Sequence, residues 1–175
     1  MKVSVIPEVD ALTGASFDLV LDPGAVTDVP IEGLVDGSYS VVVESSVPVV
    51  TAMRASTVAA QKVGTVPAGA SDVAWFAAAT ALSDTAYTTI ASGPGASLHL
   101  VNTGDTEATV TVGSAVVPVP AGASVTVPVT GGESLSIGGA DGLFASVSLQ
   151  APGRLASYLV NSAASGVAPL TVYRG

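Results

Sequence analysis

Three runs of alternating apolar and polar residues fill the stretch from Leu98 to Val129, LHLVNTGDTEATVTVGSAVVPVPAGASVTVPV. The runs are separated by Asn102-Thr-Gly-Asp105 and by Pro120-Ala-Gly122. Because successive side chains of a strand point to opposite faces, each run predicts a strand with one buried and one solvated face. Val and Thr, which dominate the runs, pack well on such a surface. Short strands in quick succession predict an antiparallel sandwich or barrel rather than βαβ units.

The composition indicates one or two domains with an aliphatic core. Of the 175 residues, 49% are hydrophobic but only 5% are aromatic, so Val, Ala, Leu and Ile must build the core. The chain has no cysteine, which excludes disulfides and thiolate metal sites.

The charge balance makes nucleic acid and anionic lipid poor partners. Fourteen acidic residues against five basic ones give a net charge of −9, and such a surface repels other anions. Since only 11% of the residues are charged, Ser, Thr and Gly must fill most solvent-facing positions. That surface is common in secreted bacterial β-repeat proteins and indicates an extracytoplasmic location, in the cell envelope or secreted.

Neither a membrane span nor an export signal is visible in the sequence. The longest apolar run, Val73–Leu82, is about half of the ~20 residues that a spanning helix needs, so no membrane insertion by this segment is expected. Met1-Lys2 leads at once into the alternating residues Val3–Ile6. An export signal is therefore expected upstream, in a longer chain of which this sequence is a fragment.

Val73–Leu82 is also the one segment in which a helix competes with a strand. It is rich in Ala, the best helix former, and Asp72 stands where a helix N-cap would be. Trp75 and Phe76 suit a buried strand equally well, and the neighbouring segments are all predicted strands. The strand is the favoured interpretation.

Two segments of the chain recur as an internal repeat. Gly24–Ile31 matches Gly122–Val129 at its Gly, its first Ala, the Val before Pro, and the Pro. Ala25–Ile31 is therefore predicted to be a strand in which Pro30 is equivalent to Pro128, and a proline there indicates an edge or a bulge. Tyr39, Val41, Val43 and Pro48 likewise match Leu143, Ala145, Val147 and Pro152 at one constant offset. The chain is thus predicted to be all-β, with two tandem immunoglobulin-like antiparallel β-sandwiches over residues 1–72 and 73–175.

The first copy is expected to lack its opening strands. Val3-Ser-Val5 matches Val110-Thr-Val112, so that the counterpart of Leu98–Asn102 is missing. A sandwich without that strand exposes unpaired backbone groups and part of an apolar face. Trp75 is accordingly predicted to be buried between the two copies, with coverage by a second molecule as the alternative.

These motifs resemble a family of actinobacterial cell-envelope proteins of unknown function. The resemblance rests on Leu98-x-Leu-x-Asn-x-Gly-Asp105 with the strand Ala108–Val112, on Pro118-x-Pro-Ala-Gly122 and on Val43–Arg54, while Asp72–Trp75 looks like the join between copies. Bacterial immunoglobulin-like adhesion modules have a similar Asn-x-Gly-Asp turn. The resemblance implies export, an upstream signal or anchor, and β-sandwich repeats, and it implies no activity and no catalytic residue.

His99, the sole histidine, is the first candidate for chemistry. A Ser-His-Asp catalyst is formally possible, but the sequence has no Gly-x-Ser-x-Gly elbow. The alternation of Leu98–Leu100 places His99 on the solvated face of its strand. A zinc site needs three or four ligands, and one His without Cys supplies too few. No catalytic residue is therefore assigned.

The acidic residues between Lys2 and Arg54 suggest a calcium site. No basic residue lies between those two positions, and calcium takes six to eight oxygen ligands from loops of this kind. No Asp-x-Asp-x-Asp-Gly loop is present, and the same acids would also solubilise the chain and keep sheet edges apart. The calcium candidates are Asp10, Asp22, Asp28, Glu32 and Asp36.

The sequence as a whole predicts a non-enzymatic structural or interaction module of an exported cell-envelope protein. Its expected partners are a protein or a cell-wall polysaccharide. A carbohydrate-binding module is the alternative, although the aromatic residues are too few to serve both a core and a sugar-stacking platform. A glycosidase is disfavoured, because nothing in the sequence places two acids at the required separation.

Overall fold

The computed structural model describes residues 1–8 and 13–162, and the predicted all-β class is confirmed there, with thirteen strands and no helix. Consequently the described residues hold no helix long and apolar enough to cross a membrane. The strands are β1 (Lys2–Pro7), β2 (Ala15–Asp18), β3 (Tyr39–Glu44), β4 (Ala52–Val58), β5 (Ser71–Ala77), β6 (Thr85–Thr89), β7 (Ala96–Val101), β8 (Ala108–Val112), β9 (Ala115–Val119), β10 (Ser124–Pro128), β11 (Ser134–Gly138), β12 (Phe144–Ala151) and β13 (Arg154–Leu159).

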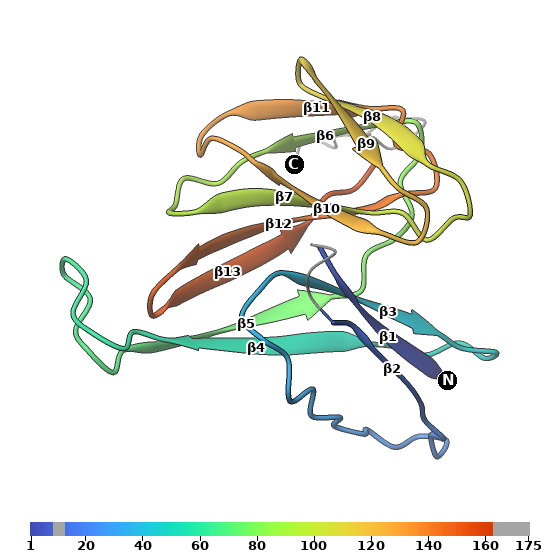
Figure 1. Ribbon diagram of the computed structural model, residues 1–175, viewed down its shortest axis with the longest axis horizontal. Helices are drawn as coiled ribbons and strands as arrows, with labels where there is room; N and C mark the ends of the chain where they lie inside the picture. Colours follow the sequence, from blue (N-terminus) through green and yellow to red (C-terminus); the bar gives the residue numbers. More distant parts are fainter. Residues whose placement is uncertain (9–12, 163–175) are drawn as a thin grey trace, which may run out of the picture.

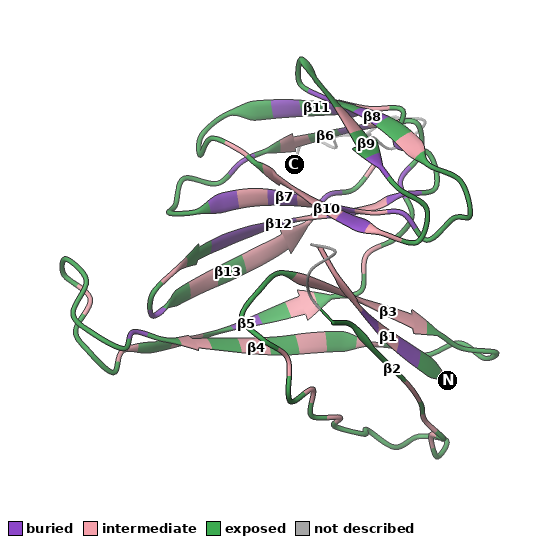
Figure 2. Ribbon diagram, in the orientation of Figure 1, coloured by how far each residue is buried: buried purple, intermediate pink, exposed green. Residues whose placement is uncertain are grey.

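Strands β6 to β13 form an antiparallel sandwich of two four-stranded sheets. One sheet has the order β10-β7-β12-β13 and the other the order β6-β11-β8-β9, and Figure 1 shows them as the two upper layers. The apolar residues of the alternating runs meet between the layers, where those of β7 and β8 are buried and those of β10 are partly buried (Figure 2). Fully buried members of this core are Leu98, Leu100, Val110, Ile137 and Val147.

The turn after β7 is held by a buried asparagine. Asn102 Nδ2 donates to the carbonyl oxygens of Thr106 at 2.8 Å and Val119 at 3.0 Å. Its Oδ1 accepts from the Gly104 N–H at 2.9 Å. The side chain thus ties together three backbone groups of this turn and of β9, which is why an Asn-x-Gly sequence suits this turn.

The N-terminal part consists of a smaller sheet and a two-stranded ribbon. The sheet has the order β2-β1-β3, and the ribbon pairs β4 with β5. β5 runs from Ser71 to Ala77 and is not a helix, so the strand interpretation is confirmed for those residues. The division of the chain after residue 72 stays a prediction; β5 runs across that position.

Ala25–Ile31 forms no strand, contrary to the sequence prediction. Residues 19–38, which join β2 to β3, contain no regular structure, and Val26 is 96% exposed. Pro30 therefore lies outside every sheet, whereas Pro128 ends β10. The proposed equivalence of the two prolines is wrong, because a matching pattern of Gly, Val and Pro specifies no partner strand.

The strand that corresponds to β7 is present in the N-terminal sheet. β1 pairs Val3 with Val43 and Val5 with Val41, just as β7 pairs Leu98 with Val147 and Leu100 with Ala145. Since Val41 and Val43 align with Ala145 and Val147, Val3 corresponds to Leu98 and not to Val110. The predicted absence of that strand is wrong. Among the described residues, what the N-terminal sheet lacks is a facing sheet like β6-β11-β8-β9.

Candidate functional site

A polar cluster joins the N-terminal sheet to the outer face of the β10-β7-β12-β13 sheet. It is centred on His99 of β7, with Glu8 after the end of β1 and Ser148 of β12 on either side of the ring. His99 Nδ1 lies 2.8 Å from Glu8 Oε1, and Nε2 lies 2.7 Å from Ser148 Oγ. Glu8 is 91 positions from His99 in the sequence.

Further hydroxyl groups surround the Glu8 carboxylate. Ser124 Oγ of β10 donates to Glu8 Oε1 at 3.2 Å. Ser40 Oγ of β3 lies 2.7 Å from Ser124 Oγ and must donate to it, because the Ser124 proton is directed at Glu8. The Ser124 hydroxyl and the His99 imidazole of one sheet thus reach the carboxylate, and the Ser40 hydroxyl of the N-terminal sheet supports Ser124.

The cluster is largely shielded from solvent. The side chain of Glu8 is 3% exposed and that of His99 is 18% exposed. Within the described part of the chain, Glu8 Oε2 is a buried oxygen without a hydrogen-bond partner. The prediction that His99 faces solvent is therefore wrong. The alternation correctly places it off the core, but the N-terminal part covers that face.

We assign the proton positions from the hydrogen-bond pattern. An ionised carboxylate only accepts, so Nδ1 carries a proton and donates it to Glu8. In the neutral ring, Nε2 then accepts from the Ser148 hydroxyl. This order of acid, histidine and serine is the one used in nucleophilic catalysis.

Two features of Ser148 oppose a catalytic role. A catalytic serine must be reached by substrate and must lie near free N–H donors that stabilise the oxyanion. Ser148 is only 9% exposed. It sits in the middle of β12, opposite Ser97 of β7 on one side and Ser157 of β13 on the other, so the surrounding N–H groups belong to ladders. The cluster has the properties of a structural joint.

A second polar contact links the ribbon to β13. Asp72 of β5 accepts hydrogen bonds from the N–H groups of Leu155 and Val73, each at 2.9 Å. The Leu155 bond is the larger cause, and both hold the pKa of the Asp72 carboxyl below its usual value. Asp72 therefore fastens a strand, and it caps no helix.

Close backbone packing completes the join. Gly153, between β12 and β13, has a φ of +65°, and a Cβ there would lie 2.8 Å from the Ala70 carbonyl oxygen. Only glycine accommodates both the left-handed conformation and this approach. The N-terminal part has two small buried side chains close to Ala70 in the sequence. They are Ala59 and Ala74, which are 0% and 7% exposed.

Trp75 is not buried between the two parts, contrary to the prediction. Its side chain is 63% exposed, and the Arg54 guanidinium lies 6.0 Å from its ring centroid. Only its backbone takes part in the join, where the Ser157 hydroxyl donates to the Trp75 carbonyl oxygen at 3.1 Å. The alternation of β5 turns Ala74 inward and Trp75 outward.

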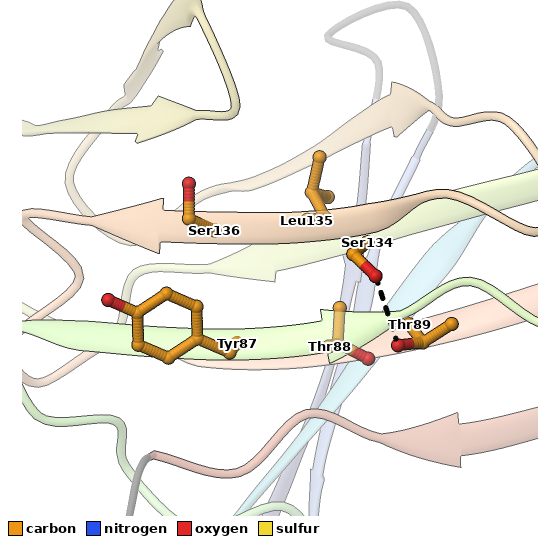
Figure 3. Close-up of a pocket in the computed structure, with 6 residues that line it drawn as sticks. All are labelled: Tyr87, Thr88, Thr89, Ser134, Leu135 and Ser136. Carbon is orange, nitrogen blue, oxygen red and sulfur yellow. Dashed lines mark hydrogen bonds between the residues drawn. The ribbon is translucent and has the colours of Figure 1, made fainter.

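A shallow groove of about 450 Å³ lies on the outer face of the β6-β11-β8-β9 sheet (Figure 3). Tyr87, which is 66% exposed, stands opposite Ser136 across the β6–β11 pair. Thr89 Oγ1 and Ser134 Oγ lie 3.5 Å apart at one end of it. The groove therefore combines one exposed aromatic ring with several hydroxyl groups.

The predicted calcium ligands are not brought together by the described residues. Asp22, Asp28, Glu32 and Asp36 are all exposed, and Asp10 lies outside the described residues. In the described ranges, no three His, Asp or Glu side chains lie close enough to share a metal ion. The sequence pattern showed a run of acids, but not whether the loops converge.

The sequence analysis missed Glu8 and Ser148 as partners of His99. The useful signal was His99 itself, a histidine flanked by Leu98 and Leu100 in the most regular strand of the chain. Its partners come from distant segments of the sequence. Only the pairing of β7 with β12 shows that Ser146 lies opposite His99, and that Ser148, two residues further along β12, lies on the same face.

Comparison with known protein families identifies a match over most of the chain. The model of a family of unknown function (DUF5719) matches residues 12–140. No curated protein and no solved structure matches the chain.

Proposed function

We propose that this chain, which belongs to the family of unknown function DUF5719, is a non-enzymatic structural or interaction module of an exported cell-envelope protein. The composition supports this role, because a surface of Ser, Thr and Gly with 11% charged residues is typical of secreted β-proteins. The polar joint supports it as well, since it fastens two parts of the chain and leaves Ser148 inaccessible.

The observation that carries the proposal is a face of the β4–β5 ribbon on which three apolar side chains are exposed beside Arg54 and two serines. Val58, Val73 and Trp75 are 60%, 51% and 63% exposed. They share one face of the ribbon, because Arg54 pairs with Trp75, Ser56 with Val73 and Val58 with Ser71. Figure 2 shows exposed residues recurring along both strands. Exposed apolar patches on soluble proteins mark interaction surfaces.

Co-sedimentation with a purified cell-wall polysaccharide and with an envelope-protein fraction tests this function. We expect one of the two to retain the wild type, and Trp75→Ser to reduce retention at least tenfold. Val116→Ser is the matched control, since Val116 is 67% exposed on β9 of the opposite sheet. Equal retention of both variants, or no retention of the wild type, contradicts the proposal.

Location is tested separately by fractionating the cells that produce the protein. An antibody against the sandwich should detect the chain in the envelope or medium fraction. Its recovery with a cytoplasmic marker enzyme would overturn the extracytoplasmic assignment without affecting the binding result.

The groove of Figure 3 favours a carbohydrate-binding module as the second candidate. An exposed aromatic ring stacks on the apolar face of a sugar, and Thr89, Ser134 and Ser136 offer hydroxyls beside Tyr87. Titration with neutral oligosaccharides distinguishes this candidate. Tyr87→Ala should abolish binding and Trp75→Ser should leave it unchanged, whereas the reverse pattern assigns sugar binding to the ribbon.

A further inference from the structure

The long connection between β2 and β3 has a strand-like sequence but no strand partner. Residues 19–38 contain no regular structure, and Val20 and Val26 are each 96% exposed. Loops of this length without structure of their own are uncommon in compact proteins and are usually functional. Ala25–Ile31, AVTDVPI, has the β-branched residues that favour a strand.

One strand of the ribbon offers an open edge. β4 pairs with β5 along all seven of its residues, and no other strand of the described chain pairs with β4. An edge strand presents unpaired N–H and C=O groups, to which an extended segment can add. This edge borders the face that carries Arg54 and Trp75.

The charges of the two segments are complementary. The connection carries Asp22, Asp28, Glu32 and Asp36, all exposed, and residues 3–53 contain no Lys or Arg. The β4–β5 hairpin carries Arg54 and Lys62, and the carboxylate of its only acid, Asp72, accepts from two backbone N–H groups. Within an acidic chain, this hairpin is the region that favours an acidic segment.

We propose that Ala25–Ile31 of one copy adds as a strand to the β4 edge of a second copy, with Asp28 beside Arg54. The inference rests on the proposed interaction role of the ribbon and names its partner. Both halves of the contact lie on the same sequence, which points to a second copy of this chain. The two surfaces differ, so the contact is heterologous and generates rings or open chains of copies.

Because the chain has no cysteine, disulfide crosslinking tests the contact directly. If Asp28 faces Arg54, an antiparallel addition places Val26 opposite Ser56, and a parallel addition places it opposite Ala52. Val26→Cys protein is mixed in equal amounts with Ser56→Cys or Ala52→Cys protein and oxidised. We expect one mixture to give at least tenfold more mixed dimer than Val26→Cys with Val116→Cys, the control on β9.

Sedimentation tests whether the unmodified chain associates by the same contact. The wild-type mass should rise with concentration, and the double variant Val26→Pro/Thr27→Pro should keep the chain monomeric because proline cannot donate to a ladder. The N–H of residue 26 points at β4 in an antiparallel addition and that of residue 27 in a parallel one. Neither residue makes a ladder bond within the chain, so the melting temperature should not change.

Charge exchange provides the matched control. Asp28→Lys and Arg54→Glu should each weaken association at least fivefold, and mixing the two variants should restore it. Glu107→Lys alters the net charge as Asp28→Lys does but lies outside the contact, and it should have no effect.

Three results would overturn the inference. These are a wild type that stays monomeric at all concentrations, a mixed dimer no more abundant than in the Val116→Cys control, and a Val26→Cys/Ser56→Cys chain that crosslinks only within itself. Crosslinking does not depend on binding to envelope components. Its failure and the failure of the proposed function are therefore separate results.

Discussion

At the scale of single residues, Asp72 shows how one carboxylate can fasten two strands from different parts of the chain. Its oxygens accept the N–H groups of Leu155 and Val73, and these bonds lower its pKa. A carboxyl with a lowered folded-state pKa stabilises the fold above its unfolded pKa. That stabilisation is lost as the pH falls through the folded value.

Asp72→Asn should therefore lower the melting temperature near neutral pH and make little difference in strong acid. The difference between wild type and variant should shrink as the pH falls below about 4, where an ordinary aspartate titrates. Thermal melts at a series of pH values measure this difference. Asp141→Asn, at an exposed turn, is the control and should show no such trend, and a difference independent of pH would contradict the assigned role.

At the scale of strands, local alternation predicted much of the fold, and long-range pairing supplied the rest. β7, β8 and β10 were predictable, because Leu98–Val129 contains both the alternating residues and the turns that separate them. Ala25–Ile31 has the same local pattern but no partner strand, and its pattern alone could not reveal that. In β5 the sequence predicted a strand but not that Ala74 faces inward and Trp75 outward.

Trp75→Ala and Leu98→Ala should therefore differ strongly in their effect on stability. Leu98 is 0% exposed, and its truncation should cost about 2–5 kcal/mol because a cavity replaces packed atoms. Trp75 is 63% exposed, so its truncation should stay within about 0.5 kcal/mol, as for other surface sites. Urea unfolding followed by circular dichroism measures both. A loss of several kcal/mol for Trp75→Ala would show that the ring is buried in solution.

At the scale of the whole molecule, the polar cluster around His99 controls how the N-terminal sheet is attached to the sandwich. Glu8 lies 91 positions from His99, and the partners of its carboxylate come from β7 and β10. No local pattern predicts such a cluster, because it exists only after both sheets have formed. The sequence alone predicted that His99 lies on a strand and points away from the core. It did not predict the contact between His99 and Glu8.

His99→Ala should release the N-terminal sheet while leaving the sandwich folded. Glu8 is 3% exposed at its side chain, and leaving a buried hydrogen-bonding group without its partner costs about 1–3 kcal/mol, and more for a charged group. Amide exchange in β1 and β3 should therefore accelerate at least tenfold, since 1.4 kcal/mol corresponds to about tenfold in the opening equilibrium. Exchange in β8 and β11, which lie in the other sheet, should be unchanged. Hydrogen exchange followed by mass spectrometry resolves these segments, and Ser136→Ala on the far face serves as the control. Equal acceleration in β1 and β8 would mean that the two parts unfold as one unit, and that the cluster stabilises the whole chain rather than the attachment.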